Sequence, residues 1–205
     1  MSLIKRRSFI KNNHGLAAVE FALIAPLLIL LFLGTVETSY AISVDRKVSR
    51  TASAVADLVT QSSELDVSDI KSFMTIANKI MAPYDMVPCI VVSSIRIQAG
   101  QALIVDSVDN SSGVTPAPTS QCTNSGNPND VARTTRTTGT PYPVPDAIKI
   151  DGTVLVAAEV QMDHSPIVGF FGYNDNGVSK DTTAIELGDQ ILLRPRIGND
   201  ITFNP

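Results

Sequence analysis

Residues 15–36 read GLAAVEFALIAPLLILLFLGTV, and this stretch decides the fold of the chain. It carries one charged residue, Glu20, and from Phe21 to Val36 it carries none. As an α-helix, 22 residues span about 33 Å, which is enough to cross a hydrocarbon layer of about 30 Å. Pro26 would break a helix in water, but membrane helices tolerate proline. The stretch therefore predicts a transmembrane helix.

The charge of the chain is unevenly distributed around this helix. Residues 1–14 hold four basic residues (Lys5, Arg6, Arg7 and Lys11) and no acid, whereas the remainder holds 12 Lys or Arg against 20 Asp or Glu, a net charge of −8. Basic residues that flank a membrane helix favour the cytoplasmic side. We therefore expect residues from about 38 onward to lie outside the inner membrane of a bacterium. A basic tip on an acidic body argues against nucleic-acid binding, which requires a basic surface.

Three interpretations of the N-terminal segment remain open. The first is a plain membrane anchor. The second is a cleaved secretory signal, because Ser39-Tyr40-Ala41 fits a small-x-small cleavage site, although the apolar stretch exceeds the usual 7–15 residues of a signal core. The third is a prepilin-type segment, in which the cut follows a glycine and a glutamate is the fifth residue of the mature chain. Here Gly15 precedes Leu16, and Glu20 is fifth counting from Leu16, so the spacing favours the third interpretation.

The string GLAAVEFALIAPLLILLFLGTVE, residues 15–37, resembles the N-terminal signature of the TadE-like proteins, which are minor pilin-like subunits of the Tad/Flp tight-adherence pilus system. Two later strings, VLVAAEVQMDHSPIVGFF (154–171) and ILLRPRIG (191–198), are similar to the closing strands and the Arg-Pro-Arg ending of alphaproteobacterial members. The chain departs from the pattern at Phe21, where the pilin-type cut often has tyrosine after the glutamate. The ring is kept and the hydroxyl is lost.

The resemblance implies a minor pilin-like membrane subunit that assembles or initiates a Tad-type adhesion pilus. It implies a prepilin peptidase, other pilin-like subunits, the major pilin, the inner-membrane pilus platform and membrane lipid as partners, and no nucleic acid. It also implies a single-pass protein of the bacterial inner membrane, with a cytoplasmic N-terminus and a periplasmic C-terminal domain, and leaves incorporation into the extracellular fibre open. The alternative is a membrane-anchored envelope binding module with no pilus role.

The resemblance also assigns roles to three residues. Cleavage between Gly15 and Leu16 would free an amine on Leu16, with a reference pKa of about 7.7–8.0 that leaves it mostly cationic at neutral pH. In pilins such a glutamate pairs with the amine of a neighbouring subunit, which in a low-dielectric helix bundle would set the register of assembly. The alternative role for Glu20 is stabilisation of the N-terminus of its own helix.

Periodicity predicts two helices in the outer part of the chain. Apolar residues recur on one face of a helix that continues from the membrane segment: Val44, Val48, Ala52, Val55 and Val59. A second helix, capped by Asp66 or Ser68, is expected to end before Pro83.

Strands are predicted after the two helices. Residues 89–97 and 102–108 read as a hairpin, residues 147–150 and 153–162 as two further strands, and residues 183–193 as a last one. Helices followed by strands indicate an α+β fold, in which the N-terminal transmembrane helix continues as an amphipathic helix packed on an antiparallel, pilin-like sheet.

The chain thus divides into a basic cytoplasmic leader (1–15), a transmembrane helix (16–37) and an extracytoplasmic α+β domain (38–205). Residues 110–145 are rich in Ser, Thr, Pro, Asn and Gly and predict a polar surface loop. Arg133 and Arg136 within it are expected to be solvated. Cys89 and Cys122 are the only cysteines, and outside the cytoplasm they can form a disulfide, which would stabilise the fold by roughly 3–4 kcal/mol. Two free thiols are the alternative.

We expect no enzyme activity, cofactor or metal site. Asp163-His164-Ser165 contains the residue types of a hydrolase triad, but neighbours on a strand point to opposite faces of the sheet. Two histidines and two cysteines do not complete a zinc site with the usual spacing, and the sequence lacks a phosphate loop and a dinucleotide-binding fingerprint.

Overall fold

The structure, a computed structural model, describes residues 15–84, 87–110, 132–133, 136, 138–164, 173–175, 178–180, 185–197 and 201–204. The chain divides into two compact units, Met1–Tyr40 and Ala41–Pro205, which we describe separately. The elements, in chain order, are α1 (Leu16–Thr60), β1 (Glu64–Asp66), α2 (Val67–Met81), β2 (Cys89–Gln98), β3 (Gln101–Asp109), β4 (Ala132–Arg133), the 3-10 turn η2 (Asp146–Ile148), β5 (Val154–His164), β6 (Tyr173–Asp175), β7 (Val178–Lys180), β8 (Ile185–Leu193) and β9 (Thr202–Asn204).

The described part of the first unit is the N-terminal portion of α1. This helix is long and apolar enough to cross a membrane, and is a candidate membrane span by length and composition. No other part of the chain covers its large apolar side chains, among the residues that the structure describes. A membrane-spanning segment needs such side chains to face lipid. Where polar residues begin, the hydroxyls of Thr35, Thr38 and Ser39 donate to the carbonyl oxygens four residues earlier, at 2.8–2.9 Å. These bonds satisfy the hydroxyls within the helix itself.

In the second unit, the C-terminal part of α1 is a core helix. Its buried residues lie on one face: Val44, Val48, Thr51, Ala52, Val55, Ala56, Val59 and Thr60. The predicted apolar stripe is therefore confirmed. After the helix, Arg196 donates its backbone N–H to the Thr60 carbonyl at 2.9 Å, and its guanidinium forms an ion pair with Asp57. These contacts fasten the segment after β8 to the end of α1.

Both ends of α2 are capped. Asp66 accepts hydrogen bonds from the backbone N–H groups of Ser68 and Asp69, and the Asp69 carboxylate accepts in return from the Asp66 N–H, which completes a capping box. The hydrogen bond from the Asp69 N–H is the main reason that the pKa of Asp66 lies below its usual value. At the other end, the Lys47 ammonium of α1 donates to the carbonyl oxygens of Ile80 and Ala82. One α1 side chain thus satisfies carbonyls that helix geometry leaves open.

Five strands form an antiparallel sheet in the order β4-β3-β2-β5-β8, within the residues that the structure describes. The predicted hairpin is confirmed as β2 and β3, and the strands predicted at 153–162 and 183–193 are confirmed as β5 and β8. The hairpin turn consists of Ala99 and Gly100, both with positive φ (50° and 73°). Such angles match the two-residue turn that suits the twist of a hairpin.

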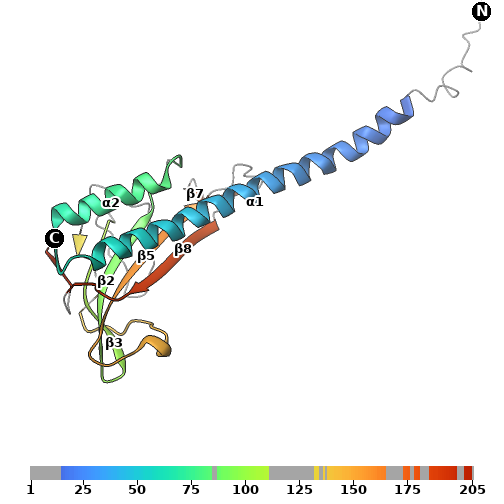
Figure 1. Ribbon diagram of the computed structural model, residues 1–205. Coiled ribbons are helices and arrows are strands. Elements are labelled where there is room, and N and C mark those ends of the chain that lie inside the picture. The colour runs from blue at the N-terminus through green and yellow to red at the C-terminus, as the bar shows by residue number, and fades with distance from the viewer. Residues whose placement is uncertain are drawn as a thin grey trace, which may run out of the picture. The chain divides into compact units, whose positions relative to one another are not determined.

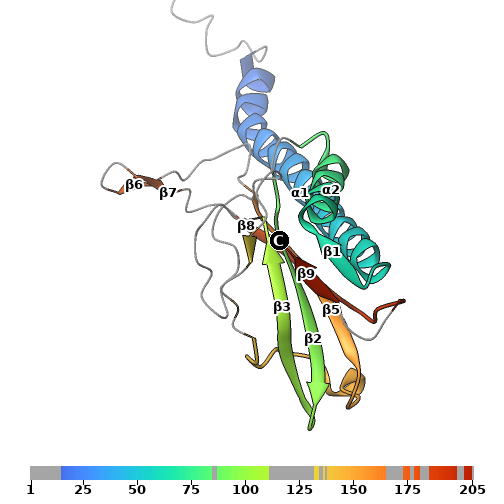
Figure 2. The same cartoon turned by 90° about the vertical axis from the view of Figure 1, so that its left-hand side faces the viewer.

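The C-terminal part of α1 and the helix α2 cover one face of this sheet (Figures 1 and 2). The chain is therefore an α+β protein with a long N-terminal helix packed on an antiparallel sheet, as predicted. The opposite face carries a second apolar cluster, which Tyr142 and Val144 complete from the segment after β4. The sheet residues of this cluster are Ile95, Ile97, Ala102, Ile104, Leu155 and Ala157.

The secondary structure differs from the sequence-based expectation in several places. The strand predicted at 147–150 is wrong, because Asp146–Ile148 is a 3-10 turn that directly follows Pro145. A short parallel pair, β1 with β9, was not predicted. This pair buries Leu65 and Phe203, which are 1% and 0% exposed. Three-residue strands are too short to show a period of two, so the sequence pattern does not reveal them.

The C-terminal segment offers a matched test of this core. Ile201 is fully buried, whereas Ile197, four residues earlier, is 57% exposed. We expect Ile201→Ala to lower the free energy of unfolding by about 2–5 kcal/mol, because it removes buried methyl groups and leaves a cavity. Ile197→Ala should change it by less than about 0.5 kcal/mol. Denaturant unfolding of the full chain in detergent measures both values. Equal losses would contradict the burial described here.

Candidate functional site

The sequence places its predicted processing and assembly residues at the start of α1. Gly15 directly precedes the helix, Leu16 is its first residue, and Glu20 is its fifth. A Cβ added at Gly15 would meet no atom of the chain within 4 Å. The Glu20 side chain is exposed, as are the apolar residues around it. The roles predicted for these three residues need a peptidase or a second subunit, and they stay predictions.

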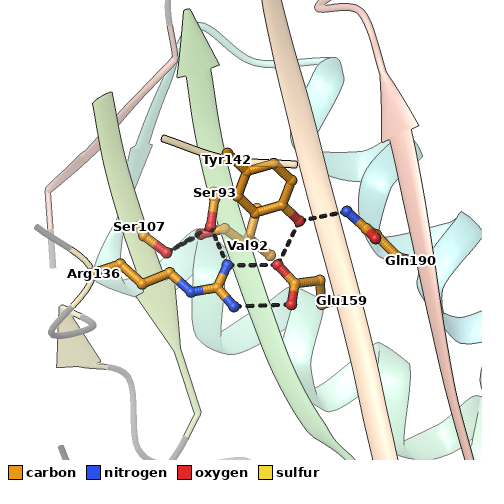
Figure 3. A network of polar contacts seen from close by, with 7 residues as sticks. All are labelled: Val92, Ser93, Ser107, Arg136, Tyr142, Glu159 and Gln190. Carbon is orange, nitrogen blue, oxygen red and sulfur yellow. Dashed lines mark hydrogen bonds and ion pairs between the residues drawn. The ribbon is translucent and has the colours of Figure 1, made fainter. Parts of the chain in front are cut away.

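A network of polar side chains lies on the face of the sheet opposite the helices (Figure 3). At its centre the Arg136 guanidinium holds the Glu159 carboxylate with two bonds, of 2.5 and 2.9 Å. The Tyr142 hydroxyl donates to the same carboxylate at 2.6 Å and accepts from the Gln190 amide at 2.6 Å. Arg136 also donates to the Ser93 hydroxyl at 3.1 Å, and Ser93 lies 2.8 Å from the Ser107 hydroxyl.

Burial sets the electrostatics of this network. The side chain of Arg136 is 7% exposed and that of Glu159 is 18% exposed. Burial, and then the nearby charge of Glu159, raises the pKa of Tyr142, so the phenol stays protonated and donates its hydrogen bond. Burial alone would lower the pKa of Arg136, but the hydrogen bond and charge of Glu159 outweigh it and raise that pKa. The Arg136 guanidinium therefore stays charged in the folded protein.

The network fastens the segment that carries Arg136 and Tyr142 to the sheet. Next to β3, Gly139 N–H donates to the Ile104 carbonyl at 2.7 Å, and Ile104 N–H donates to the Thr140 carbonyl at 3.0 Å. Tyr142 N–H continues the pairing with the Ala102 carbonyl at 2.8 Å. We call residues 138–142 the edge segment, because they run along the edge of β3. The guanidinium of Arg136, two residues before the edge segment, contacts Ser93 of β2 and Glu159 of β5.

The expectation that Arg136 is solvated is therefore wrong. The sequence contained one signal of this pairing, since Glu159 is a charged residue in a run, VLVAAEV, that reads as a buried strand. A buried carboxylate requires a partner. Sequence spacing could not identify it, because the partner lies 23 residues away in a polar segment.

A second buried polar contact lies at the C-terminal end of β3. The Asn110 side chain accepts from the Ile90 N–H at 2.8 Å and donates to the Pro88 carbonyl at 3.0 Å. Asn110 is fully buried. Its amide thus ties the end of β3 to the start of β2. Most of the predicted polar loop that follows, residues 111–131, lies outside the described residues.

The remaining candidate residues are only partly described. Cys89 is 2% exposed at the start of β2, but Cys122 lies outside the described residues, so the disulfide stays a prediction. His164 is fully buried at the end of β5, and Ser165 lies outside the described residues. Among the residues that the structure describes, no three His, Cys, Asp or Glu side chains are grouped so that they could hold a metal ion.

The polar network predicts the effect of removing one member of the ion pair. Arg136→Met leaves the Glu159 carboxylate buried without its cation, and breaking such a pair costs about 3–5 kcal/mol of folding free energy. Arg136→Met/Glu159→Met should recover much of the loss, because no charge is then left buried. Lys149→Met is the control, since Lys149 pairs with the exposed Asp146 and should have little effect. Urea unfolding of the full chain measures all three; a double variant no more stable than the single one would contradict the pairing.

Comparison with known proteins finds one similarity, at the N-terminal end of the chain. The family model described as TadE-like protein matches residues 15–57. This range contains Gly15, Leu16, Glu20 and most of α1. No curated protein matches the chain, and no solved structure matches it. The sequence-based resemblance is thereby confirmed over this range: residues 15–57 of the chain are similar to the TadE-like proteins.

Proposed function

We propose that the chain is a minor pilin-like membrane subunit that serves the assembly or initiation of a Tad-type adhesion pilus. The observation that carries the proposal is the TadE-like match over residues 15–57. Within that range a glycine directly precedes a long helix whose fifth residue is a glutamate. The partners proposed are a prepilin peptidase, other pilin-like subunits with the major pilin, and the inner-membrane platform of the pilus.

The proposed topology places residues 1–15 in the cytoplasm and the second unit in the periplasm. The apolar part of α1 supports a membrane anchor, and the four basic residues before it support a cytoplasmic N-terminus. In this setting the peptidase cuts after Gly15, and the new Leu16 amine becomes the partner for a glutamate at position 20. Since Glu20 is near the end of the apolar stretch, its charge costs less than at the bilayer centre.

Replacement of Gly15 tests the proposed processing. We expect Gly15→Leu to leave full-length precursor in the membrane, because the added side chain obstructs the peptidase. Since a Cβ at Gly15 meets nothing in the chain itself, the block cannot be attributed to a clash within the fold. Gly34→Leu is the matched control, because Gly34 also has open space around its Cα and lies inside the helix.

The readout is N-terminal sequencing of the membrane-extracted protein, with gel mobility as a second measure. The mature form should begin at Leu16 and be about 1.8 kDa lighter than the precursor. Met1 as the first residue of the wild-type protein would favour a plain anchor, and Ile42 would favour secretion. Either result would refute the proposed cut.

Replacement of Glu20 tests the proposed assembly role. Glu20→Gln keeps the shape of the side chain and removes its charge, so insertion into the membrane should be unchanged or slightly easier. Co-purification with other pilin-like subunits should weaken, because the amine of the neighbouring subunit loses its counter-charge. Glu37→Gln, at the other acidic residue of the N-terminal part of α1, is the control. Undiminished co-purification and normal piliation with Glu20→Gln would show that the charge has no part in assembly.

A further inference from the structure

Basic residues gather at one end of the second unit. Residues 41–50 of α1 and 75–84, from the second half of α2 and its exit, together hold Arg46, Lys47, Arg50 and Lys79 and one acid, Asp45, a net charge of +3. We call these two segments the basic collar. Four of the 12 basic residues that follow residue 14 thus lie in these 20 positions, although the chain after residue 14 carries a net charge of −8.

The two segments of the collar are in contact with each other. Lys47 Nζ bonds the Ile80 carbonyl at 3.0 Å and lies 5.7 Å from the centroid of the Tyr84 ring. Thr51 Oγ1, one turn further along α1, lies 3.6 Å from Met81 Sδ. The Lys47 ammonium is therefore engaged in contacts at the C-terminal end of α2. The other three cations, Arg46, Arg50 and Lys79, are exposed.

The collar also exposes apolar side chains beside its cations. Ile42 is 49% exposed on α1, and Ile76 is 41% exposed on α2. Large apolar groups next to Arg and Lys suit the boundary between lipid and water, where the apolar part enters the headgroup layer and the cation meets phosphate.

Chain connectivity limits how far the start of the collar can lie from the end of the candidate membrane span. Ala41 follows Val36, the last residue of the apolar stretch, by five residues. At a maximum of about 3.6 Å per residue, this link places Ala41 within about 18 Å of the end of that stretch, whatever its conformation.

We propose that the basic collar binds anionic phospholipid headgroups at the membrane surface from which α1 emerges. Because the remainder of the second unit is acidic, an anionic surface repels it, and the collar is the end that such a surface attracts. The contact would orient the folded unit before it meets other subunits. This inference rests on the proposed membrane anchorage.

A tryptophan reporter tests the proposal, because the chain contains no tryptophan of its own. Full-length Ile76→Trp is placed in nanodiscs whose lipids carry brominated acyl chains, which quench nearby tryptophan. One set contains only zwitterionic phosphatidylcholine and the other also contains phosphatidylglycerol. Ile150→Trp is the matched control, since Ile150 is 50% exposed and adjoins Asp151, which bonds the N–H of Gly100 at the tip of the β2–β3 hairpin.

The same tryptophan reporter, Ile76→Trp, tests whether binding requires the positive charge of the collar. Arg46→Gln/Lys79→Gln removes one Arg and one Lys from the collar. Lys71→Gln/Arg194→Gln removes the same two residue types, both exposed, from the first half of α2 and from the end of β8. We expect a blue shift and quenching of Ile76→Trp in the anionic discs, with several-fold weaker quenching in the collar variant or in high salt. The control variant and Ile150→Trp should show no such change.

The outcomes separate this inference from the membrane anchor. If the protein stays in neutral and anionic discs but Ile76→Trp is not quenched, the collar proposal is overturned and the anchor stands. Failure to remain in either kind of disc overturns both. Equal quenching in neutral discs, or in the collar variant, shows that charge does not drive the contact and overturns the proposal. A blue shift that grows with the number of copies per disc, without quenching, assigns the surface to another copy of the chain instead.

Discussion

The rest of the structure depends on one helix that is compatible with two different surroundings. In residues 16–36 of α1 the surface is apolar nearly all round, whereas from Val44 to Thr60 only one face is buried. A helix satisfies its own backbone hydrogen bonds in either environment, which an isolated strand cannot do. The change from a fully apolar surface to a one-sided stripe therefore lets one continuous element serve as candidate anchor and as core helix.

The sheet could be predicted largely because its strands are long. β2, β3, β5 and β8 each contain nine or more residues, so β-branched composition and alternation identify them. The second helix was located by its cap and its apolar face, and Asp66 proves to be the capping residue. Strands of only two or three residues were not predicted, because so few residues show no periodicity. Pairing of β1 with β9 joins residues about 140 positions apart through only three residues on each side.

The candidate site was predicted less completely, for physical reasons. Gly15 and Glu20, at the start of α1, are only five positions apart, so their spacing can be recognised from the sequence alone. The Arg136–Glu159 pair is not local, and its arginine lies in a segment whose composition resembles that of a solvated loop. Only the position of Glu159 within an apolar strand indicated that a charged partner was needed. A two-bond contact between guanidinium and carboxylate also requires a defined geometry, so it favours one placement of the segment over its alternatives.

The edge segment has a consequence for how the protein behaves at high concentration. An open sheet edge offers unpaired N–H and C=O groups to any other strand, and this is a common route to aggregation. Residues 138–142, with β4, occupy the outer side of β3 at both of its ends. Where these segments pair with β3, a second copy of the chain cannot add a strand to it. At the paired positions of β3, contact between copies is therefore left to side chains, which can discriminate between partners. β8 is the strand at the other edge of the described sheet, and this covering does not extend to it.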